Sequence, residues 1–162
     1  MHFRHALQVL IDHVLKTAGL REAFSAIYTN PAKFDASGCL TLEPYHNQNW
    51  CAISTDNLCK GHILDQHPRT RYGGVDKEDY YDVIIYIGDG TNDLCPARRL
   101  RQTDLVFARR GYKLAAEIEK EAARGGKGTD AVKARVVLWD TGFDIIREVN
   151  KELNALRHRY QV

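Results

Sequence analysis

The chain has 162 residues, enough for one domain that buries roughly 70% of its unfolded surface. Its 23 lysines and arginines nearly balance 21 aspartates and glutamates, and the resulting net charge of +2 does not predict a nucleic-acid partner. Four scattered cysteines do not suggest a disulfide framework, and no apolar run approaches the roughly 20 residues that cross a bilayer. We therefore expect a cytoplasmic protein without a membrane segment, folded as a single α/β domain over residues 1–162 with a flexible start at about residues 1–5.

The N-terminal region predicts a helix followed by short extended segments. Apolar residues recur at spacings of three and four between Ala6 and Ala18, which indicates a helix with a core-facing side that Gly19 is placed to end. Ser25–Thr29 is a short strand candidate. Phe34–Tyr45 predicts a β-hairpin in which Gly38 takes the positive-φ position of the turn. Histidines on a polar face need no ligand, so we interpret three of them as solvated: His2, His5 and His13.

The polar stretch that follows the hairpin contains two cysteines, Cys51 and Cys59. A zinc site needs close pairs such as Cys-x2-Cys, and Ser54 stands where the second cysteine of such a pair would be. We therefore favour a loop with reduced, semi-buried thiols over a zinc site.

A second helix is expected after this loop. Ser54, Thr55 or Asp56 can cap it, and it is expected to run to about His67, with Lys60 in its second turn. Pro68 lies just beyond the expected end, and the glycine-containing segment from Pro68 to Asp79 is expected to be a connecting loop.

The most informative stretch lies between residues 83 and 96. Val83–Ile87 is an apolar, largely β-branched run without alternation, which predicts a central strand buried on both faces of a parallel sheet. Gly88 and Gly90 then let the backbone turn sharply. The turn brings the Asp89 carboxylate to the carboxyl end of the strand, where open α/β sheets bind their ligands.

Asp89 and Asp93 flank this turn, with Asn92 between them. Two carboxylates and an amide around one point are typical of Mg²⁺, which completes its octahedron with water and phosphate oxygens. A tight turn in which Asp and Asn only cap the local backbone is the alternative. Asp93 replaces the third glycine of a dinucleotide fingerprint, and the ligand pattern of an EF-hand loop is absent.

Helices and strands alternate through the rest of the chain. This alternation predicts a doubly wound, mostly parallel sheet covered by helices, with the hairpin as a small insertion. The expected elements are a short helix Pro96–Arg101, a strand Leu105–Phe107, a helix Tyr112–Ala122, a flexible connector Gly125–Gly128, a strand Ala134–Trp139, and a helix that starts at the capping pair Thr141 and Asp144. Several basic residues could attract an anionic substrate or form a solvated face: Arg98, Arg99, Arg101, Arg109, Arg110 and Lys113.

Four segments carry a resemblance to a known family. Gly88–Pro96 reads Gly-Asp-Gly-Thr-Asn-Asp-Leu-Cys-Pro and is similar to the fourth motif of haloacid-dehalogenase-type phosphatases, specifically of the pyridoxal phosphate phosphatase and phosphoethanolamine/phosphocholine phosphatase group. Asn57–Lys60 resembles the segment that bears the third-motif lysine. Val106–Tyr112 and Val136–Trp139 resemble later segments, so the resemblance runs from about Leu20 to the C-terminus and covers the back portion of that family's chain.

The resemblance implies a Rossmann-like core and Mg²⁺-dependent hydrolysis of small phosphomonoesters of the pyridoxal phosphate, phosphocholine or phosphoethanolamine type. It implies that Asp89 and Asp93 bind Mg²⁺, that Asn92 completes the site and contacts substrate, and that Lys60 contacts both the phosphate and the attacking carboxylate. Lys60 and Asp93 are then the candidate catalytic residues.

The residues with which this family attacks phosphorus have no counterpart here. The family's nucleophile is the first Asp of an Asp-x-Asp-x-Thr motif, and no two aspartates in this sequence are separated by a single residue. The second-motif Ser or Thr is also unmatched, and Ser54 stands where the family often has cysteine. We therefore expect the C-terminal portion of such a phosphatase, weakly active or inactive alone, because loss of a covalent nucleophile removes several orders of magnitude in rate. The alternative is a non-catalytic metal- and phosphate-binding module that acts through a partner chain, with self-association through an exposed sheet edge as a further expectation.

Overall fold

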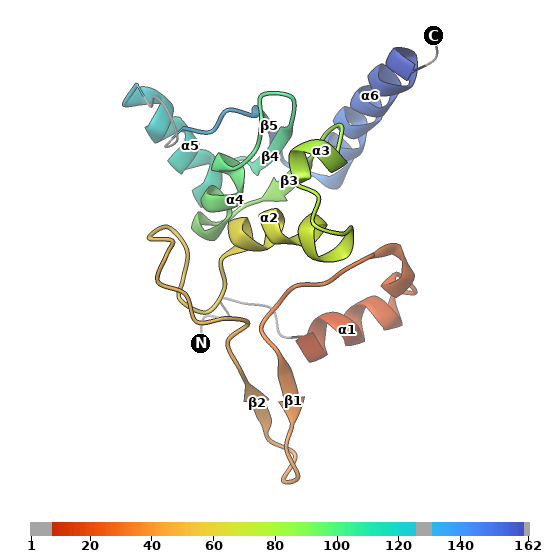
Figure 1. Cartoon of the computed structure of the whole chain (residues 1–162), viewed down its shortest axis with the longest axis vertical. Coiled ribbons are helices and arrows are strands. Elements are labelled where there is room, and N and C mark those ends of the chain that lie inside the picture. Colours follow the sequence, from red (N-terminus) through yellow and green to blue (C-terminus); the bar gives the residue numbers. More distant parts are fainter. Residues whose placement is uncertain (1–7, 126–130, 161–162) are drawn as a thin grey trace.

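The computed structural model describes residues 8–125 and 131–160, and Figure 1 shows the arrangement of their elements. The helices are α1 (Gln8–Thr17), α2 (Lys60–Arg71), α3 (Lys77–Tyr80), α4 (Leu94–Arg98), α5 (Lys113–Ala123) and α6 (Gly142–Tyr160), with 3₁₀ turns η1 (Arg21–Ala23) and η2 (Thr91–Asp93). The strands are β1 (Ala32–Phe34), β2 (Leu40–Leu42), β3 (Ile85–Gly88), β4 (Leu105–Arg109) and β5 (Arg135–Trp139).

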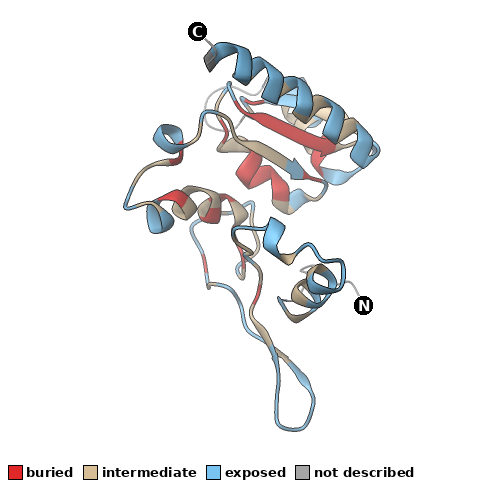
Figure 2. Ribbon diagram, turned by 90° about the vertical axis from the view of Figure 1, so that its right-hand side faces the viewer, coloured by how far each residue is buried: buried red, intermediate tan, exposed pale blue. Residues whose placement is uncertain are grey.

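A parallel sheet of order β3-β4-β5 forms the centre of the fold, which is of the α/β class that the sequence predicts. Helices α5 and α6 lie on opposite sides of this sheet (Figure 1). The main core gathers around the middle strand, with Val106 and Ala108 of β4 packed near Leu114 of α5 and Leu94 and Ala97 of α4. Burial is concentrated in these elements (Figure 2). Most of the stabilisation from burying apolar side chains therefore comes from β4, α4 and α5, the elements that hold the turn after β3 in place.

Strand β3 is not the central strand that its apolar run predicts. Among the described residues it pairs with β4 only, and the side chain of Ile87 is 48% exposed. The central place is taken by β4, in which Leu105, Val106 and Phe107 are almost fully buried. An apolar run indicates that a strand can be covered on both sides, but strand order depends on long-range pairing that the run does not encode.

The N-terminal region is less buried than its sequence pattern predicts, and one of its predicted strands does not form. Helix α1 forms where expected, but it has no buried residue, and Val14 is 61% exposed. Residues 25–29 are irregular rather than a strand, because no neighbouring strand among the described residues pairs with them. The β1-β2 hairpin is confirmed, with Gly38 at φ 82°, and it projects away from the sheet (Figure 1). Its apolar side chains, including Phe34, are therefore largely exposed.

Helix α2 starts later than its capping residues predict. Lys60 is its first residue rather than part of a second turn, because the side chain of Cys59 caps the helix and accepts a hydrogen bond from the His62 amide at 3.5 Å. Thr55 and Leu58 close a separate bridge before the helix begins. Pro68 lies inside α2 and is buried, and α3 occupies part of the predicted connecting loop.

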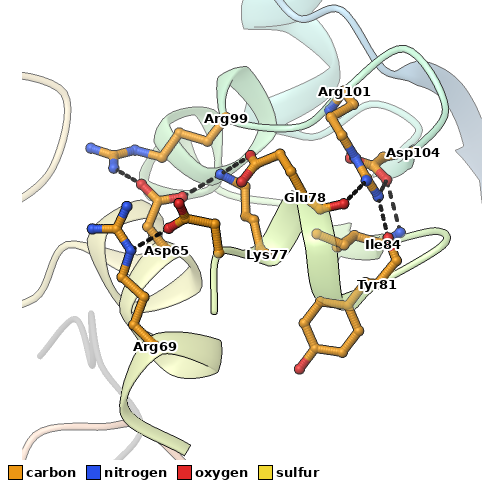
Figure 3. Close-up of polar contacts among 10 residues, drawn as sticks. Asp65, Arg69, Lys77, Glu78, Tyr81, Ile84, Arg99, Arg101 and Asp104 are labelled. Carbon is orange, nitrogen blue, oxygen red and sulfur yellow. Dashed lines mark hydrogen bonds and ion pairs between the residues drawn. The ribbon is translucent and has the colours of Figure 1, made fainter. Parts of the chain in front are cut away.

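Polar contacts fasten α3 and the start of β3 to the core (Figure 3). The buried carboxylate of Asp104 accepts hydrogen bonds from the amides of Ile84 and Arg101 and from the Arg101 guanidinium. Asp65 of α2 pairs with Lys77 and with Arg99. Two of the six basic residues that could have attracted an anion are thus engaged in structural ion pairs.

The other basic residues are mostly occupied in the same way. Arg98 pairs with Glu121, and Arg110 pairs with Asp140. The Arg109 guanidinium lies 4.2 Å from the centroid of the Tyr112 ring. The later elements follow their predictions closely, and Thr141 and Asp144 make the expected cap of α6. All but Gly125 of the predicted connector Gly125–Gly128 lies outside the described residues, as do His2 and His5.

No helix in the described part of the chain has both the length and the apolar character needed to cross a membrane.

Candidate functional site

The carboxylate of Asp93 is the centre of the candidate site. Turn η2 folds back under the end of β3 and leaves this side chain only 4% exposed. Oδ1 accepts hydrogen bonds from Lys60 Nζ at 2.7 Å and from the Tyr86 hydroxyl at 2.6 Å. Oδ2 accepts from the backbone amides of Asp89 at 3.0 Å and Gly90 at 2.9 Å. One carboxylate therefore joins the start of α2, strand β3 and the turn that follows it.

These contacts set the protonation states at the site. Burial alone would raise the pKa of the Asp93 carboxyl, but the hydrogen bonds from Lys60 and Tyr86 outweigh burial and hold that pKa below its ordinary value of 3.8. Burial and the adjacent charge of Asp93 raise the pKa of Tyr86 far above its ordinary value. At neutral pH the site therefore contains an ionised Asp93 and a neutral, hydrogen-bond-donating Tyr86.

The two glycines of the turn are needed for space rather than for left-handed backbone angles. Neither Gly88 nor Gly90 has a positive φ. A Cβ on Gly88 would lie 2.7 Å from Cβ and Cγ of Asp93, atoms that the four hydrogen bonds hold in place. A Cβ on Gly90 would lie 2.6 Å from Oδ1 of Asn92, the end of a half-buried side chain that can turn away.

This difference predicts unequal effects for two alanine substitutions. Gly88→Ala is expected to lower the free energy of unfolding by about 1–3 kcal/mol, because the added methyl group must displace Asp93. Gly90→Ala, the matched control, is expected to lower it by less than about 1 kcal/mol, since only Asn92 has to move. Urea unfolding followed by circular dichroism measures both values. Equal losses for the two variants would show that contact with Asp93 is not what requires glycine at residue 88.

Asp89 lies beside this cluster and differs from Asp93 in exposure. Its side chain is exposed on the turn, while its backbone carbonyl accepts a hydrogen bond from the Leu114 amide at 3.0 Å. Its negative charge is close enough to contribute to the raised pKa of Tyr86. An exposed carboxylate at the carboxyl end of a parallel strand offers the hard oxygen ligands that Mg²⁺ prefers. The residues present therefore fit a Mg²⁺ ion, with Asp89 as the accessible ligand.

The predicted site residues are thus brought together to different degrees. Lys60 and Asp93 are in direct contact, and Asp89 and Asn92 lie on the adjoining turn. Both oxygens of Asp93 already accept two hydrogen bonds each, so direct metal ligation by Asp93 would require one of those donors to leave.

A cavity of about 340 Å³ lies next to the Lys60–Asp93 pair and is lined by residues that sequence reasoning did not identify as part of a site. Lys60 and Tyr86 line it together with Tyr28 and His67, whose hydroxyl and Nδ1 atoms are 2.7 Å apart. In the sequence, Tyr86 is only one residue of an apolar run. The signal that could have identified it is a hydroxyl-bearing side chain in a strand that otherwise holds aliphatic residues, since a buried tyrosine hydroxyl requires a partner.

Sequence comparison shows the family to which the chain belongs. A sequence model of the family described as Putative Phosphatase matches residues 4–153. The chain belongs to the putative phosphatase family.

Curated relatives of this chain include pyridoxal phosphate phosphatase from Homo sapiens, which is 37% identical over 139 residues, covering 85% of this chain and 54% of the relative. The Mus musculus protein of the same name is 35% identical over 138 residues, with 85% and 54% covered. Phosphoethanolamine/phosphocholine phosphatase from Homo sapiens is 35% identical over 146 residues, with 90% and 52% covered. The chain thus spans about half the length of these relatives. No solved structure matches it.

Proposed function

We propose that this chain supplies the Mg²⁺- and phosphate-binding half of a phosphomonoesterase site. The observation that carries the proposal is the contact of Lys60 with Asp93, held by Tyr86 and two backbone amides at the carboxyl end of β3, with exposed Asp89 on the same turn. An ammonium group and a metal-binding carboxylate at one sheet edge are suited to neutralising the charge of a phosphoryl group.

Each residue has a separate role in this proposal. Asp89 would hold the Mg²⁺ ion, which when bound supplies a positive charge that lowers the energy of a phosphoryl group under attack. Lys60, whose side chain is 35% exposed and lines the cavity, would donate hydrogen bonds to phosphate oxygens through Nζ. Asp93 orients that ammonium group, and Asn92 contributes to the shell of the metal and substrate from the adjoining half-buried position.

The size of the cavity and the names of the relatives support a proposal about the substrate class. About 340 Å³ beside Lys60 fits a small phosphate ester rather than a macromolecule. Relatives are named for pyridoxal phosphate, phosphoethanolamine and phosphocholine, so we propose a substrate of this kind. The four cysteines are free thiols, which supports a cytoplasmic location for the protein.

The nucleophile in this proposal comes from outside these 162 residues, because no Asp-x-Asp pair occurs among them. The second candidate function, a non-catalytic module that works through a partner chain, is favoured by the same gap and by the edge position of β3. Self-association through that edge stays a prediction.

Calorimetric titration of the pure chain with inorganic phosphate tests the proposal. Mg²⁺ is expected to tighten phosphate binding by about tenfold, because the two ligands attract each other when bound side by side. Asp89→Asn is expected to abolish this Mg²⁺ effect while Lys60 retains weak phosphate binding. Asp79 is an exposed carboxylate on α3, before the start of β3. Asp79→Asn is therefore the matched control and should bind phosphate and Mg²⁺ like the parent chain. Phosphate binding that is indifferent to Mg²⁺ in the parent chain would overturn the proposal.

A further inference from the structure

Three cysteines from separate segments converge behind the candidate site. Cys51 lies in the loop after the hairpin, Cys59 caps α2, and Cys95 belongs to α4. Their sulfur atoms all lie within 4.8 Å of one another. Cys95 Sγ is 3.4 Å from Cys51 Sγ and 3.6 Å from Cys59 Sγ, and all three are free thiols. Sequence spacing gives no sign of this, because Cys95 is 44 residues from Cys51.

These separations match those of a metal site. Four ligands at about 2.3 Å from a tetrahedral Zn²⁺ ion place neighbouring sulfur atoms about 3.8 Å apart. Two of the three sulfur pairs are already near that spacing and the third lies within 4.8 Å, so shifts of the side chains could bring all three to one ion. Cys59 and Cys95 are buried, and Cys51 is half-buried.

Ser54 occupies the fourth position of the cluster. Its Oγ atom lies 3.4 Å from Cys51 Sγ and 3.3 Å from Cys59 Sγ. A hydroxyl, or a water molecule beside it, can complete a tetrahedron around three thiolates. Ser54, which in the sequence counted against a zinc site, therefore lies where a fourth ligand is needed.

The loop that carries Cys51 and Ser54 is organised before any ion binds. Buried Gln48 accepts a hydrogen bond from the Cys51 amide at 2.8 Å and donates to the carbonyl oxygens of Cys51, Ser54 and Thr55. The Cys59 amide donates to His46 Nε2 at 2.8 Å. This loop is fixed around its own polar residues, so the ordering entropy of binding an ion is small.

The start of helix α2 contributes a backbone donor to the cysteine cluster. Cys59 is the N-cap of the twelve-residue helix α2, and its Sγ accepts a hydrogen bond from the His62 amide. A helix N-terminus stabilises an anionic ligand. Gly61 keeps the space beside the cluster open, since a Cβ there would lie 2.5 Å from Cys95 Sγ.

We propose that Cys51, Cys59 and Cys95 bind one structural Zn²⁺ ion, with Ser54 or a water molecule as the fourth ligand. The ion replaces the three thiol protons, which are released to solvent, so no oxidant or reductant is needed. Cys59 precedes Lys60, and Cys95 is two residues from Asp93. The ion therefore clamps together the two segments that carry the phosphate-binding pair, and its binding does not depend on the proposed phosphatase function.

Metal analysis of the purified full chain tests this inference. Mass spectrometry of metal content is expected to find one Zn²⁺ per chain after incubation with Zn²⁺ and gel filtration. Replacement by Co²⁺ is expected to give the intense visible absorption of a tetrahedral site together with thiolate-to-cobalt charge transfer. Zn²⁺ is expected to raise the melting temperature of the parent chain, because it binds the folded state.

Four variants complete the experiment. Cys95→Ser and Cys51→Ser are expected to lose stoichiometric Zn²⁺ and the cobalt spectrum, and Cys51→Ser covers the case in which the buried Cys95→Ser does not fold. Cys39→Ser, at the exposed hairpin turn, is the matched control and keeps both signals. Ser54→Cys adds a fourth thiolate and is expected to bind Zn²⁺ at least about tenfold more tightly. Zn²⁺ content in the parent chain no higher than in Cys51→Ser, or a disulfide joining two of the three cysteines in the purified protein, would overturn the proposal.

Discussion

Replacing Asp93 with asparagine is expected to lower the free energy of unfolding by about 3 kcal/mol. Four donors converge on this buried carboxylate, and an amide offers only one acceptor atom to them. Its NH₂ group would face either two backbone amides or the Lys60 ammonium. The value lies at the lower end of the range of about 3–5 kcal/mol for a broken buried pair, because the Lys60 side chain is 35% exposed and regains water.

Urea unfolding measured by circular dichroism checks this value. Asp89→Asn makes the same chemical change on the neighbouring exposed carboxylate, and it is expected to shift stability by less than about 0.5 kcal/mol. A loss for Asp93→Asn as small as that for Asp89→Asn would refute the view that Asp93 holds the site together.

The difference in stability between the parent chain and Asp93→Asn is expected to depend on pH. The pKa of Asp93 is lowered from 3.8 on folding, so the unfolded chain binds the proton more readily than the folded chain. The stabilisation from Asp93 is therefore complete above pH 3.8 and is lost as the pH falls below that value through the folded-state pKa. The stability difference between the parent and Asp93→Asn is expected to be constant near neutral pH and to shrink in strong acid. A difference that shrank on going to alkaline pH would contradict this sign.

Phosphate release by the pure chain is expected to be about a thousandfold or more slower than that of human pyridoxal phosphate phosphatase assayed beside it. The residues proposed to bind Mg²⁺ and phosphate stabilise charge, but the proposal places the attacking carboxylate outside these residues, so the reaction of the pure chain would depend on water alone. Loss of a covalent nucleophile therefore outweighs whatever Lys60 and Asp89 retain.

The assay uses pyridoxal phosphate, phosphocholine and phosphoethanolamine with Mg²⁺, and phosphate is measured colorimetrically. Lys60→Met is the control variant, because any residual turnover at this site should fall further when its ammonium is removed. Turnover comparable to the human enzyme, and lost in Lys60→Met, would mean that another residue of this chain attacks phosphorus. Turnover unchanged in Lys60→Met would indicate a contaminating phosphatase.

The candidate site and the cysteine cluster share two short segments of chain. In the first segment, Cys59 belongs to the cysteine cluster and Lys60 to the candidate site. In the second segment, Cys95 belongs to the cysteine cluster and Asp93 to the candidate site. Stability of the cysteine cluster and geometry of the Lys60–Asp93 pair are therefore expected to be coupled, because a shift of either segment moves both.

The sequence by itself determined the local features of this protein. The helical repeats that give α5 and α6, the strands at β4 and β5 and the glycine at the hairpin turn depend on neighbouring residues, so their patterns are legible without a fold. The motif from Gly88 to Asp93 likewise indicated a site at the end of a strand, because a turn between a strand and a helix is specified within a few residues.

Tertiary structure alone decided which residues meet. It placed β3 at an edge, left α1 without a buried residue, filled both oxygens of Asp93 with hydrogen-bond donors and made Tyr86 one of them. It also brought Cys95 to Cys51 across 44 residues, which is the contact on which the proposed zinc site rests. These outcomes depend on pairing and packing between distant segments, and the free energy of such contacts is set by the whole fold rather than by any stretch of sequence.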